Sequence, residues 1–328
     1  DNRIVSGYRF SNAWAKDQRL FFDLEFSRPY TNVTFLNEQT TGSNVKAAFE
    51  FDSSISNFLE VKIGISPVDK EGAKLNRVTE LRDKSFDQLR EEADNIWEKQ
   101  LNKIVVETYE EEDMYNFYSA LYHTMIAPNL YQDVDGRYRG MDMEIHQDKS
   151  LNYHTVFSLW DTFRAAHPLY TIIEQERTND FIKTFLNKYD EGGIIPIWDL
   201  SANYTNTMIG YHSIPVMADA YLKGIRDYDI DKAYEVMKHS AMQDKNGLES
   251  YKNTGFVSVE TEHESVSKTL EYAYDDWTIA TMAKALANEE DYKTFIQRAQ
   301  YYKNVYDPQT KFMRGRINNK WFAPFDPY

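Results

Sequence analysis

Acidic residues gather in one stretch of the sequence, residues 260–277. If this stretch is helical, each residue turns by about 100°, and Glu264, Glu271 and Asp275 then point within roughly 40° of one another. Partly buried carboxylates on one helix face could bind hydroxyl groups or transfer protons. A solvated helix face, opened by a capping box of Thr261 and Glu264, would explain the same pattern.

A tryptophan and an aspartate are adjacent at Trp160 and Asp161, near the predicted start of a helix. The indole could offer a flat platform to a sugar ring, and the carboxylate could accept hydrogen bonds from its hydroxyls. Alternatively, Asp161 pairs with Arg164 along the helix and Trp160 belongs to the core. The residues by themselves leave both interpretations open.

A polar loop runs from Trp198 to His212 and leads into a predicted helix that contains Pro215. Proline fits a helix only in its first turn or at a kink, which places His212 at the mouth of this helix. Loops at one end of a helical scaffold commonly carry binding sites. Trp198 and His212 are therefore further candidates, although a lone histidine is more often structural.

Composition and motifs disfavour several classes of function. The 328 residues carry 37 Lys+Arg against 52 Asp+Glu, a net charge of −15, which argues against nucleic acid as a partner. No run of about 18 apolar residues occurs, so we expect no transmembrane segment. The chain has no cysteine, and the fingerprints GxGxxG, GxSxG and HExxH are absent. Acids and aromatics remain as the carriers of chemistry.

These residues need a scaffold, and the hydrophobic periodicity predicts two kinds of element. Residues 1 to about 78 show the period of two that is typical of strands. A helical period follows. It predicts helices over residues 86–103, 110–125, 156–174, 179–190, 206–223, 230–244, 262–288 and 289–304. We therefore predict an α+β fold in which a β part precedes paired helices.

Three long motifs in the helical part resemble glycoside hydrolase family 92. They are Ser158–Leu169 (SLWDTFRAAHPL), Thr207–Ser213 (TMIGYHS) and His263–Trp277 (HESVSKTLEYAYDDW). Two shorter ones, Gly7–Trp14 (GYRFSNAW) and Lys62–Ser66 (KIGIS), are similar to the end of that family's N-terminal β-sandwich. The resemblance implies a calcium-dependent, inverting exo-α-mannosidase that acts on mannose-containing glycans.

The same resemblance implies an architecture. We expect the C-terminal strands of a β-sandwich domain in residues 1–80, a linker helix in 81–105 and a partial (α/α)6 toroid in 106–328. On this interpretation the chain is a central fragment that lacks both ends. The resemblance also implies export to the periplasm or the cell surface, although no signal segment is present in the sequence.

The resemblance assigns site residues as well. Trp160 and Asp161 would help to hold the terminal mannose. Further candidates for the pocket are Arg164, Trp198, His212, Glu264, Glu271 and Asp275. In this family the general acid follows a Pro-Phe-Asp-Pro stretch, here residues 324–327, and the base and calcium ligands lie further on. We therefore expect the acid, the base and the calcium ligands beyond Tyr328, with Glu264 or Glu271 as the fallback acid and no metal ligand within the chain.

Two other functions stay open at this point. The chain could be a non-catalytic glycan-binding module, which would bind mannose without calcium. It could also belong to a different glycosidase built on an (α/α)6 toroid, which would not respond to mannose-configured inhibitors. We expect no mannosidase turnover from the 328 residues alone.

Overall fold

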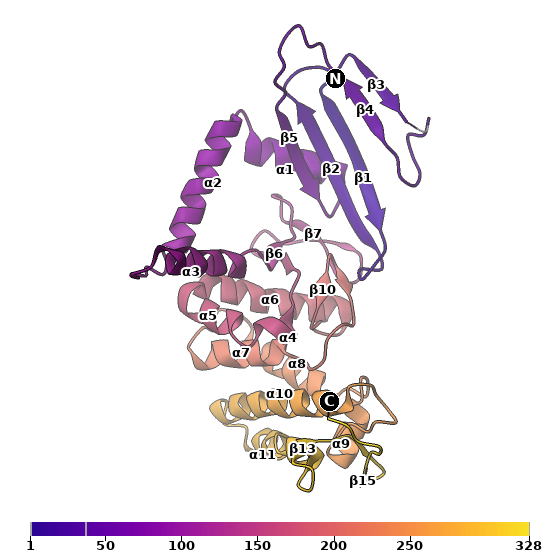
Figure 1. Cartoon of the computed structure of the whole chain (residues 1–328), viewed down its shortest axis with the longest axis vertical. Coiled ribbons are helices and arrows are strands. Elements are labelled where there is room, and N and C mark those ends of the chain that lie inside the picture. Colours follow the sequence, from indigo (N-terminus) through magenta and orange to yellow (C-terminus); the bar gives the residue numbers. More distant parts are fainter. Residues whose placement is uncertain (1, 37, 328) are drawn as a thin grey trace. The chain divides into compact units, whose positions relative to one another are not determined.

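A computed structural model describes residues 2–36 and 38–327 of the chain. The chain divides into two compact units, and each is described by itself. Unit 1 comprises residues 1–118, 131–139 and 145–150, and unit 2 comprises residues 119–130, 140–144 and 151–328. Strands dominate the first 66 residues and helices the later part, which confirms the mixed α+β class (Figure 1). The domain boundaries expected from the sequence stay a prediction.

The elements of the first half are short strands and three helices. The strands are β1 (Ile4–Ser11), β2 (Gln18–Phe26), β3 (Asn32–Phe35), β4 (Ala47–Glu50), β5 (Val61–Ser66), β6 (Asn129–Leu130), β7 (Arg137–Arg139), β8 (Ile145–Gln147) and β9 (His154–Thr155). The helices are α1 (Lys70–Leu81), α2 (Phe86–Leu101) and α3 (Glu111–Thr124).

The second half consists of helices joined by short loops and small hairpins. The helices are α4 (Leu159–Thr162), α5 (Ala166–Ile173), α6 (Gln175–Gly192), α7 (Ser213–Leu222), α8 (Ile230–Met242), α9 (Leu248–Thr254), α10 (Ser265–Ala285), α11 (Glu289–Arg298) and the 3-10 helix η1 (Tyr301–Val305). The hairpin strands are β10 (Asp199–Leu200), β11 (Asn203–Tyr204), β12 (Tyr306–Asp307), β13 (Phe312–Met313), β14 (Arg316–Ile317) and β15 (Lys320–Trp321).

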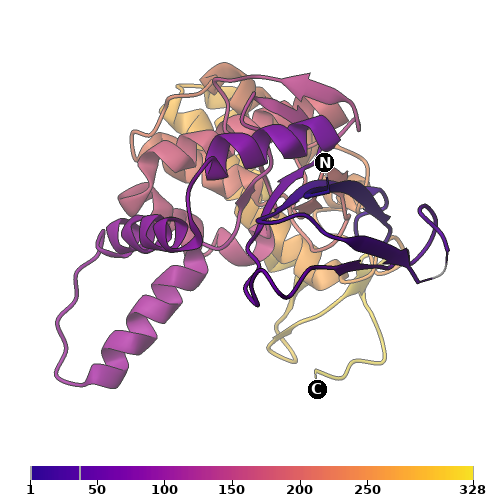
Figure 2. The ribbon, with the colours of Figure 1, turned by 90° about the horizontal axis from the view of Figure 1, so that it is seen from above.

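The main sheet of unit 1 is antiparallel, with strand order β1-β2-β5. Helix α1 packs across one of its faces (Figure 2). The approach is close because β5 presents Gly64, where an added Cβ would lie 2.1 Å from the carbonyl oxygen of Ala73 in α1. The contact is polar as well: Arg77 of α1 donates to Asp23 over 2.6 Å and forms a second ion pair with Glu25.

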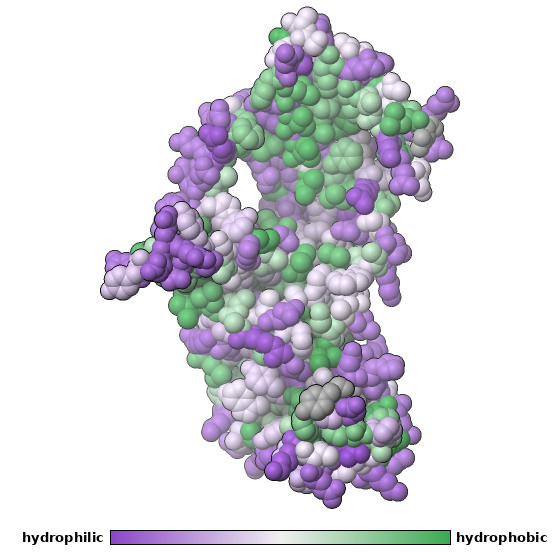
Figure 3. All heavy atoms as spheres, viewed as in Figure 1, coloured by the Kyte–Doolittle hydropathy of each residue, from purple (hydrophilic) through white to green (hydrophobic). Residues whose placement is uncertain are grey.

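The opposite face of this sheet is apolar and exposed. Successive strand residues point to opposite faces, so Val61, Ile63 and Ile65 lie together on the face that α1 does not cover. These side chains are 44%, 53% and 58% exposed. Figure 3 shows hydrophobic residues gathered over β2 and β5. Among the described residues of unit 1, no element covers this patch.

The core of unit 2 is a continuous hydrophobic cluster supplied by its helices. Helix α10 contacts α7, α8 and α11, while α6 contacts α5, α7 and α8. Fully buried members such as Phe185, Ile214, Met237 and Ile279 come from four different helices. This packing fixes the start of α7, next to His212, and the first half of α10, which carries Glu271 and Asp275.

Most of the predicted helices are present in the structure, and three differences concern the site and unit 1. Residues 156–174 do not form one helix, because Ala165 has a non-helical backbone (φ −143°) between α4 and α5. Residues 206–212 precede α7 as a loop, since Asn206, Met208 and Gly210 all have positive φ. Helix α1 lies where strands were expected. Its buried residues include Asn76 and Arg77, so it shows little of the apolar periodicity on which the prediction depended.

One further property concerns membranes. Among residues 2–36 and 38–327, no helix combines the length and the apolarity needed to cross a bilayer.

Candidate functional site

Three segments of unit 2 bring the predicted residues together. Helix α4 supplies Trp160, the loop before α7 supplies His212, and α10 supplies Glu271 and Asp275. A backbone bridge between Ser158 and Trp198 ties the start of α4 to the polar loop. Leu159, fully buried, fixes α4 to the core.

Glu271 and Asp275 are one turn apart on α10 and both face His212. Asp275 Oδ1 lies 2.8 Å from His212 Nδ1, and Asp275 Oδ2 accepts the backbone N–H of Tyr211 over 2.8 Å. On the other side of the imidazole, Glu271 Oε2 lies 3.4 Å from His212 Nε2. The prediction that these two carboxylates share a helix face is therefore confirmed by the geometry.

Burial controls the electrostatics of this cluster. Asp275 and His212 are both fully buried. Burial raises the pKa of Asp275 above its ordinary value, because a carboxylate loses hydration, and the charge and hydrogen bond of His212 oppose that rise. The ring of Phe163 stacks on His212 with 4.3 Å between centroids, which closes one side of the imidazole. His212 is thus hydrogen-bonded to Asp275, faces Glu271 and is covered on one side by Phe163.

The loop needs a glycine immediately before Tyr211. Gly210 has a φ of +86°, a conformation that L side chains rarely adopt, and a Cβ at this position would lie 2.3 Å from His212 Nε2. A glycine at position 210 therefore permits both the turn and the close approach of the imidazole.

Trp160 and Arg164 surround the same carboxylate, Glu271. The indole Nε1–H of Trp160 donates to Glu271 Oε1 over 3.0 Å, and Arg164 Nη2 donates to the same oxygen over 2.8 Å. The Arg164 guanidinium also lies over the Trp160 ring, 5.1 Å from its centroid, and over Phe163 at 4.7 Å. Arg164 therefore pairs with Glu271, and not with Asp161, the alternative that the sequence suggested.

Asp161 and Trp198 lie at the edge of the cluster. Asp161 is exposed, and Ser158 Oγ donates to one of its oxygens over 2.6 Å. Trp198 is partly buried, and its backbone carbonyl accepts from Thr205. Both side chains come from segments that the Ser158–Trp198 bridge joins. Their roles in ligand binding stay predictions.

Glu264 does not belong to the helix face on which it was predicted. It precedes the first residue of α10, has a left-handed backbone (φ 54°) and is exposed. Its side chain makes no capping hydrogen bond, and Thr261 Oγ1 instead donates to the carbonyl of Ser258. The angular argument fails here because it assumed that the helix begins before residue 264.

The structure adds two buried ion pairs that the sequence did not single out. Arg298 Nε donates to Asp276 over 2.9 Å, and Lys188 Nζ lies 2.6 Å from Asp199 Oδ2. Burial raises the pKa of Asp276 to about 6. Asp276 follows Asp275, and Asp199 follows Trp198, so each pair anchors a segment of the site. Little in the sequence indicated these pairs, because the helices that carry Arg298 and Lys188 have the pattern of ordinary amphipathic helices.

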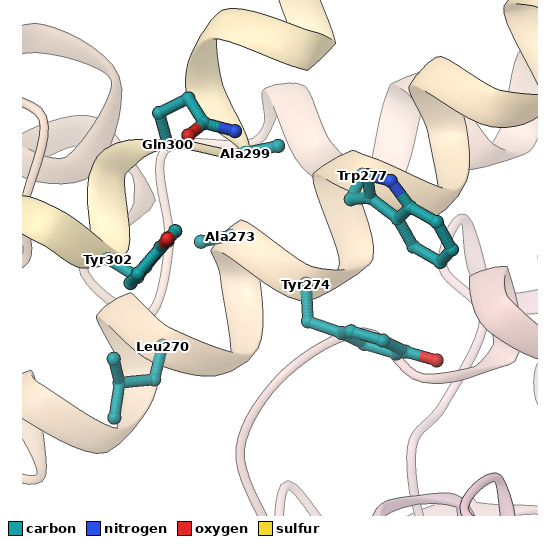
Figure 4. Close-up of a pocket in the computed structure, with 7 residues that line it drawn as sticks. All are labelled: Leu270, Ala273, Tyr274, Trp277, Ala299, Gln300 and Tyr302. Atoms are coloured by element: carbon teal, nitrogen blue, oxygen red, sulfur yellow. The ribbon is translucent and has the colours of Figure 1, made fainter.

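A cavity of about 500 Å³ lies beside the cluster, on the neighbouring face of α10 (Figure 4). It is lined by Leu270, Ala273, Tyr274, Trp277, Ala299, Gln300 and Tyr302. Tyr274 connects it to the cluster, because its ring lies 5.3 Å from that of Phe163. None of these residues was a sequence candidate, although Tyr274 and Trp277 belong to the acidic motif.

Calcium is the metal that the family resemblance implies. Within the described part of the chain, no three His, Asp or Glu side chains are placed to hold a metal ion together.

An indole, a guanidinium and several carboxylates around one surface are the groups with which proteins bind sugars. Comparison with known families identifies the class: residues 72–328 match the model of the glycosyl hydrolase family 92 catalytic domain. The chain belongs to glycoside hydrolase family 92.

Solved relatives support this assignment over the whole chain. A family GH92 α-mannosidase from Bacteroides thetaiotaomicron, solved in complex with mannoimidazole, is 36% identical with a TM-score of 0.93 over 100% of this chain and 45% of its own. The family GH92 inverting mannosidase of the same species is 30% identical with a TM-score of 0.90, over 99% of this chain and 47% of its own. The chain thus spans less than half the length of these relatives.

A curated sequence relative is also named a glycosidase. An uncharacterized secreted glycosidase of Arthroderma benhamiae is 24% identical over 290 residues, which are 82% of this chain and 33% of the relative.

Proposed function

We propose that this chain supplies the sugar-holding part of an exo-acting α-mannosidase, which hydrolyses terminal α-linked mannose from glycans with inversion and with the help of calcium. The observation that carries the proposal is the cluster of Trp160, Arg164 and Glu271 beside exposed Asp161. The resemblance to a mannosidase that was solved with mannoimidazole supports mannose as the sugar.

Each group has a chemical task in this proposal. The Asp161 carboxylate accepts hydrogen bonds from sugar hydroxyls, and charge-assisted bonds of this kind are strong. The Trp160 indole offers an apolar face to the pyranose ring. Arg164 donates to the sugar or orients the indole. Trp198, His212 and Asp275 would line or support the pocket from the loop and from α10.

The acid and base of the reaction are proposed to lie outside these residues. Inversion needs an acid and a base roughly 6.5–9.5 Å apart, with room for water between them. Glu271 accepts hydrogen bonds from Trp160 and Arg164 and faces His212, which disfavours it as a proton donor. Glu264 stands exposed at the start of α10. We therefore assign neither fallback carboxylate a catalytic role.

The finer architecture is part of the proposal. The exposed apolar face of the β1-β2-β5 sheet is what one half of a β-sandwich presents to the other, and the paired helices of unit 2 suit a partial (α/α)6 toroid. We also propose that the protein is exported, to the periplasm or the cell surface. The name of the fungal relative, a secreted glycosidase, supports export.

Calorimetric titration with mannoimidazole tests the sugar site. We expect the chain to bind this inhibitor and the Asp161→Asn variant to bind it at least about tenfold more weakly, because the amide loses the charge that strengthens the hydrogen bonds. Asp219→Asn is the matched control, since Asp219 is an α7 carboxylate that pairs with Lys223. Equal affinities of the Asp161 variant and the wild type would overturn the assignment.

Turnover by the chain alone is a separate expectation. We expect the 328 residues to release no mannose from α-linked mannobiose, with or without calcium, because the acid and the base are proposed to lie outside these residues. Chromatography of the products measures this. Calcium-dependent release of mannose would contradict it. Binding of mannose together with an inactive full-length protein would instead indicate a glycan-binding module.

A further inference from the structure

Helix α4 carries the central sugar-binding candidates, yet it is a single turn. It comprises Leu159–Thr162, and the side chain of Ser158, the N-cap residue before the helix, makes no capping hydrogen bond. A helix this short is unstable by itself, because the free energy needed to order the first turn exceeds the free energy gained from its hydrogen bonds. Its position therefore depends on contacts from elsewhere in unit 2.

Glu271 provides the polar part of those contacts. Its Oε1 accepts from Trp160 Nε1 over 3.0 Å and from Arg164 Nη2 over 2.8 Å, across more than one hundred residues of sequence. Arg164 in turn donates to the backbone carbonyl of Trp160 over 3.1 Å. One carboxylate thus holds two side chains that flank Asp161 on either side.

Glu271 is itself held in place. Its side chain is only 16% exposed, and its second oxygen faces His212 at 3.4 Å. His212 is fixed by Asp275 on the same helix, so the carboxylate has little freedom to turn away. Hydrogen bonds to a charged and largely buried acceptor are stronger than those between neutral groups.

We infer that Glu271 is a positioning residue, which fixes the ring plane of Trp160 and the place of Asp161 for the sugar. It acts through Trp160 and Arg164 and does not itself touch the sugar. The identity of the ligand, mannose, rests on the proposed function. The contact between Glu271 and Trp160 is independent of that function.

The test combines a local probe with a binding measurement. The chain has six tryptophans, and incorporation of 5-fluorotryptophan gives each a fluorine resonance, with Trp160→Phe identifying that of Trp160. The variants are Glu271→Ala, Glu271→Gln and, as the matched control, Glu235→Gln at an exposed position of α8. Mannoimidazole affinity is measured for each by calorimetry.

We expect Glu271→Ala to shift or split the Trp160 resonance alone and to weaken mannoimidazole binding about tenfold, the effect of one lost charge-assisted hydrogen bond. Glu271→Gln keeps an acceptor for the indole N–H, so it should restore the resonance and most of the affinity. Glu235→Gln should change neither. Asp161→Asn should weaken binding and leave the Trp160 resonance in place.

Two results would overturn the inference. One is an unmoved Trp160 resonance in a folded Glu271→Ala chain. The other is a moved resonance with unchanged mannoimidazole affinity. A wild-type chain that binds no mannoimidazole would instead overturn the proposed function, and the Trp160 resonance would still decide whether Glu271 holds the indole.

Discussion

Replacing Lys188 by methionine should destabilise the protein by about 3–5 kcal/mol. Lys188 and Asp199 are both fully buried, with 2.6 Å between Nζ and Oδ2. Asp199 also accepts from Thr155 Oγ1 and from the backbone N–H of Phe157, so it would stay in place as an uncompensated buried charge. The free energy of unfolding in urea measures the loss.

A second lysine on the same helix provides the control. Lys183 of α6 pairs with Asp227 over 2.8 Å, but Asp227 is 83% exposed. Lys183→Met should cost less than about 1 kcal/mol, because water and side-chain entropy offset an exposed ion pair. The double variant Lys188→Met, Asp199→Asn should recover part of the loss. Equal losses of unfolding free energy in Lys183→Met and Lys188→Met would show that burial of the Lys188–Asp199 pair is not the cause of the destabilisation.

The pair also matters for the site. Asp199 follows Trp198 and opens the short β10–β11 hairpin. Loss of its anchor should therefore loosen the loop that carries Trp198.

Replacing Arg298 by methionine should cost a similar amount near pH 8, about 3–5 kcal/mol. Arg298 Nε donates to Asp276 Oδ2, and the hydroxyls of Tyr211 and Tyr251 donate to the same carboxylate over 2.8 and 3.0 Å. Without the guanidinium, Asp276 is left fully buried with neutral donors only.

The cost should depend on pH in a defined direction. Burial raises the pKa of Asp276 from 3.8 to about 6 in the folded wild type. The folded state then binds more protons than the unfolded state between these values, so the contribution of Asp276 to stability falls as pH rises from about 4 to about 6. Removing the cation raises the pKa of Asp276 further and extends this fall to higher pH.

The difference in unfolding free energy between the Arg298→Met variant and the wild type should therefore widen from about pH 5 to about pH 8. The same comparison made in an Asp276→Asn background, with and without Arg298→Met, lacks the titrating group and should show no such dependence. Urea unfolding at both pH values checks this. A difference that is the same at both would mean that Asp276 does not carry the charge.

Local sequence spacing predicted what lies within one element. Glu271 and Asp275 share a face of α10 because residues four apart are neighbours on any helix. The same argument was wrong for Glu264, because its backbone is left-handed and the helix begins only at the next residue, Ser265. The first turn of α7 contains Pro215, as the restricted backbone of proline requires.

Hydrophobic periodicity could not predict contacts between segments that are distant in the sequence. Trp160 and Glu271 are 111 residues apart, and no spacing argument joins them. Lys188 reads as a solvent-exposed position of an amphipathic helix until the fold places Asp199 beside it. Helix α1 was missed because its buried side chains include Arg77, whose partners Asp23 and Glu25 lie on β2.

The most direct test of mannose binding at Trp160 and Asp161 is a calorimetric titration of the chain with mannoimidazole, compared with the gluco-configured imidazole as the control sugar. We expect the manno-configured compound to bind at least about tenfold more tightly, and Asp161→Asn to remove this preference. No binding of mannoimidazole, or equal affinity for the two sugars, would contradict it.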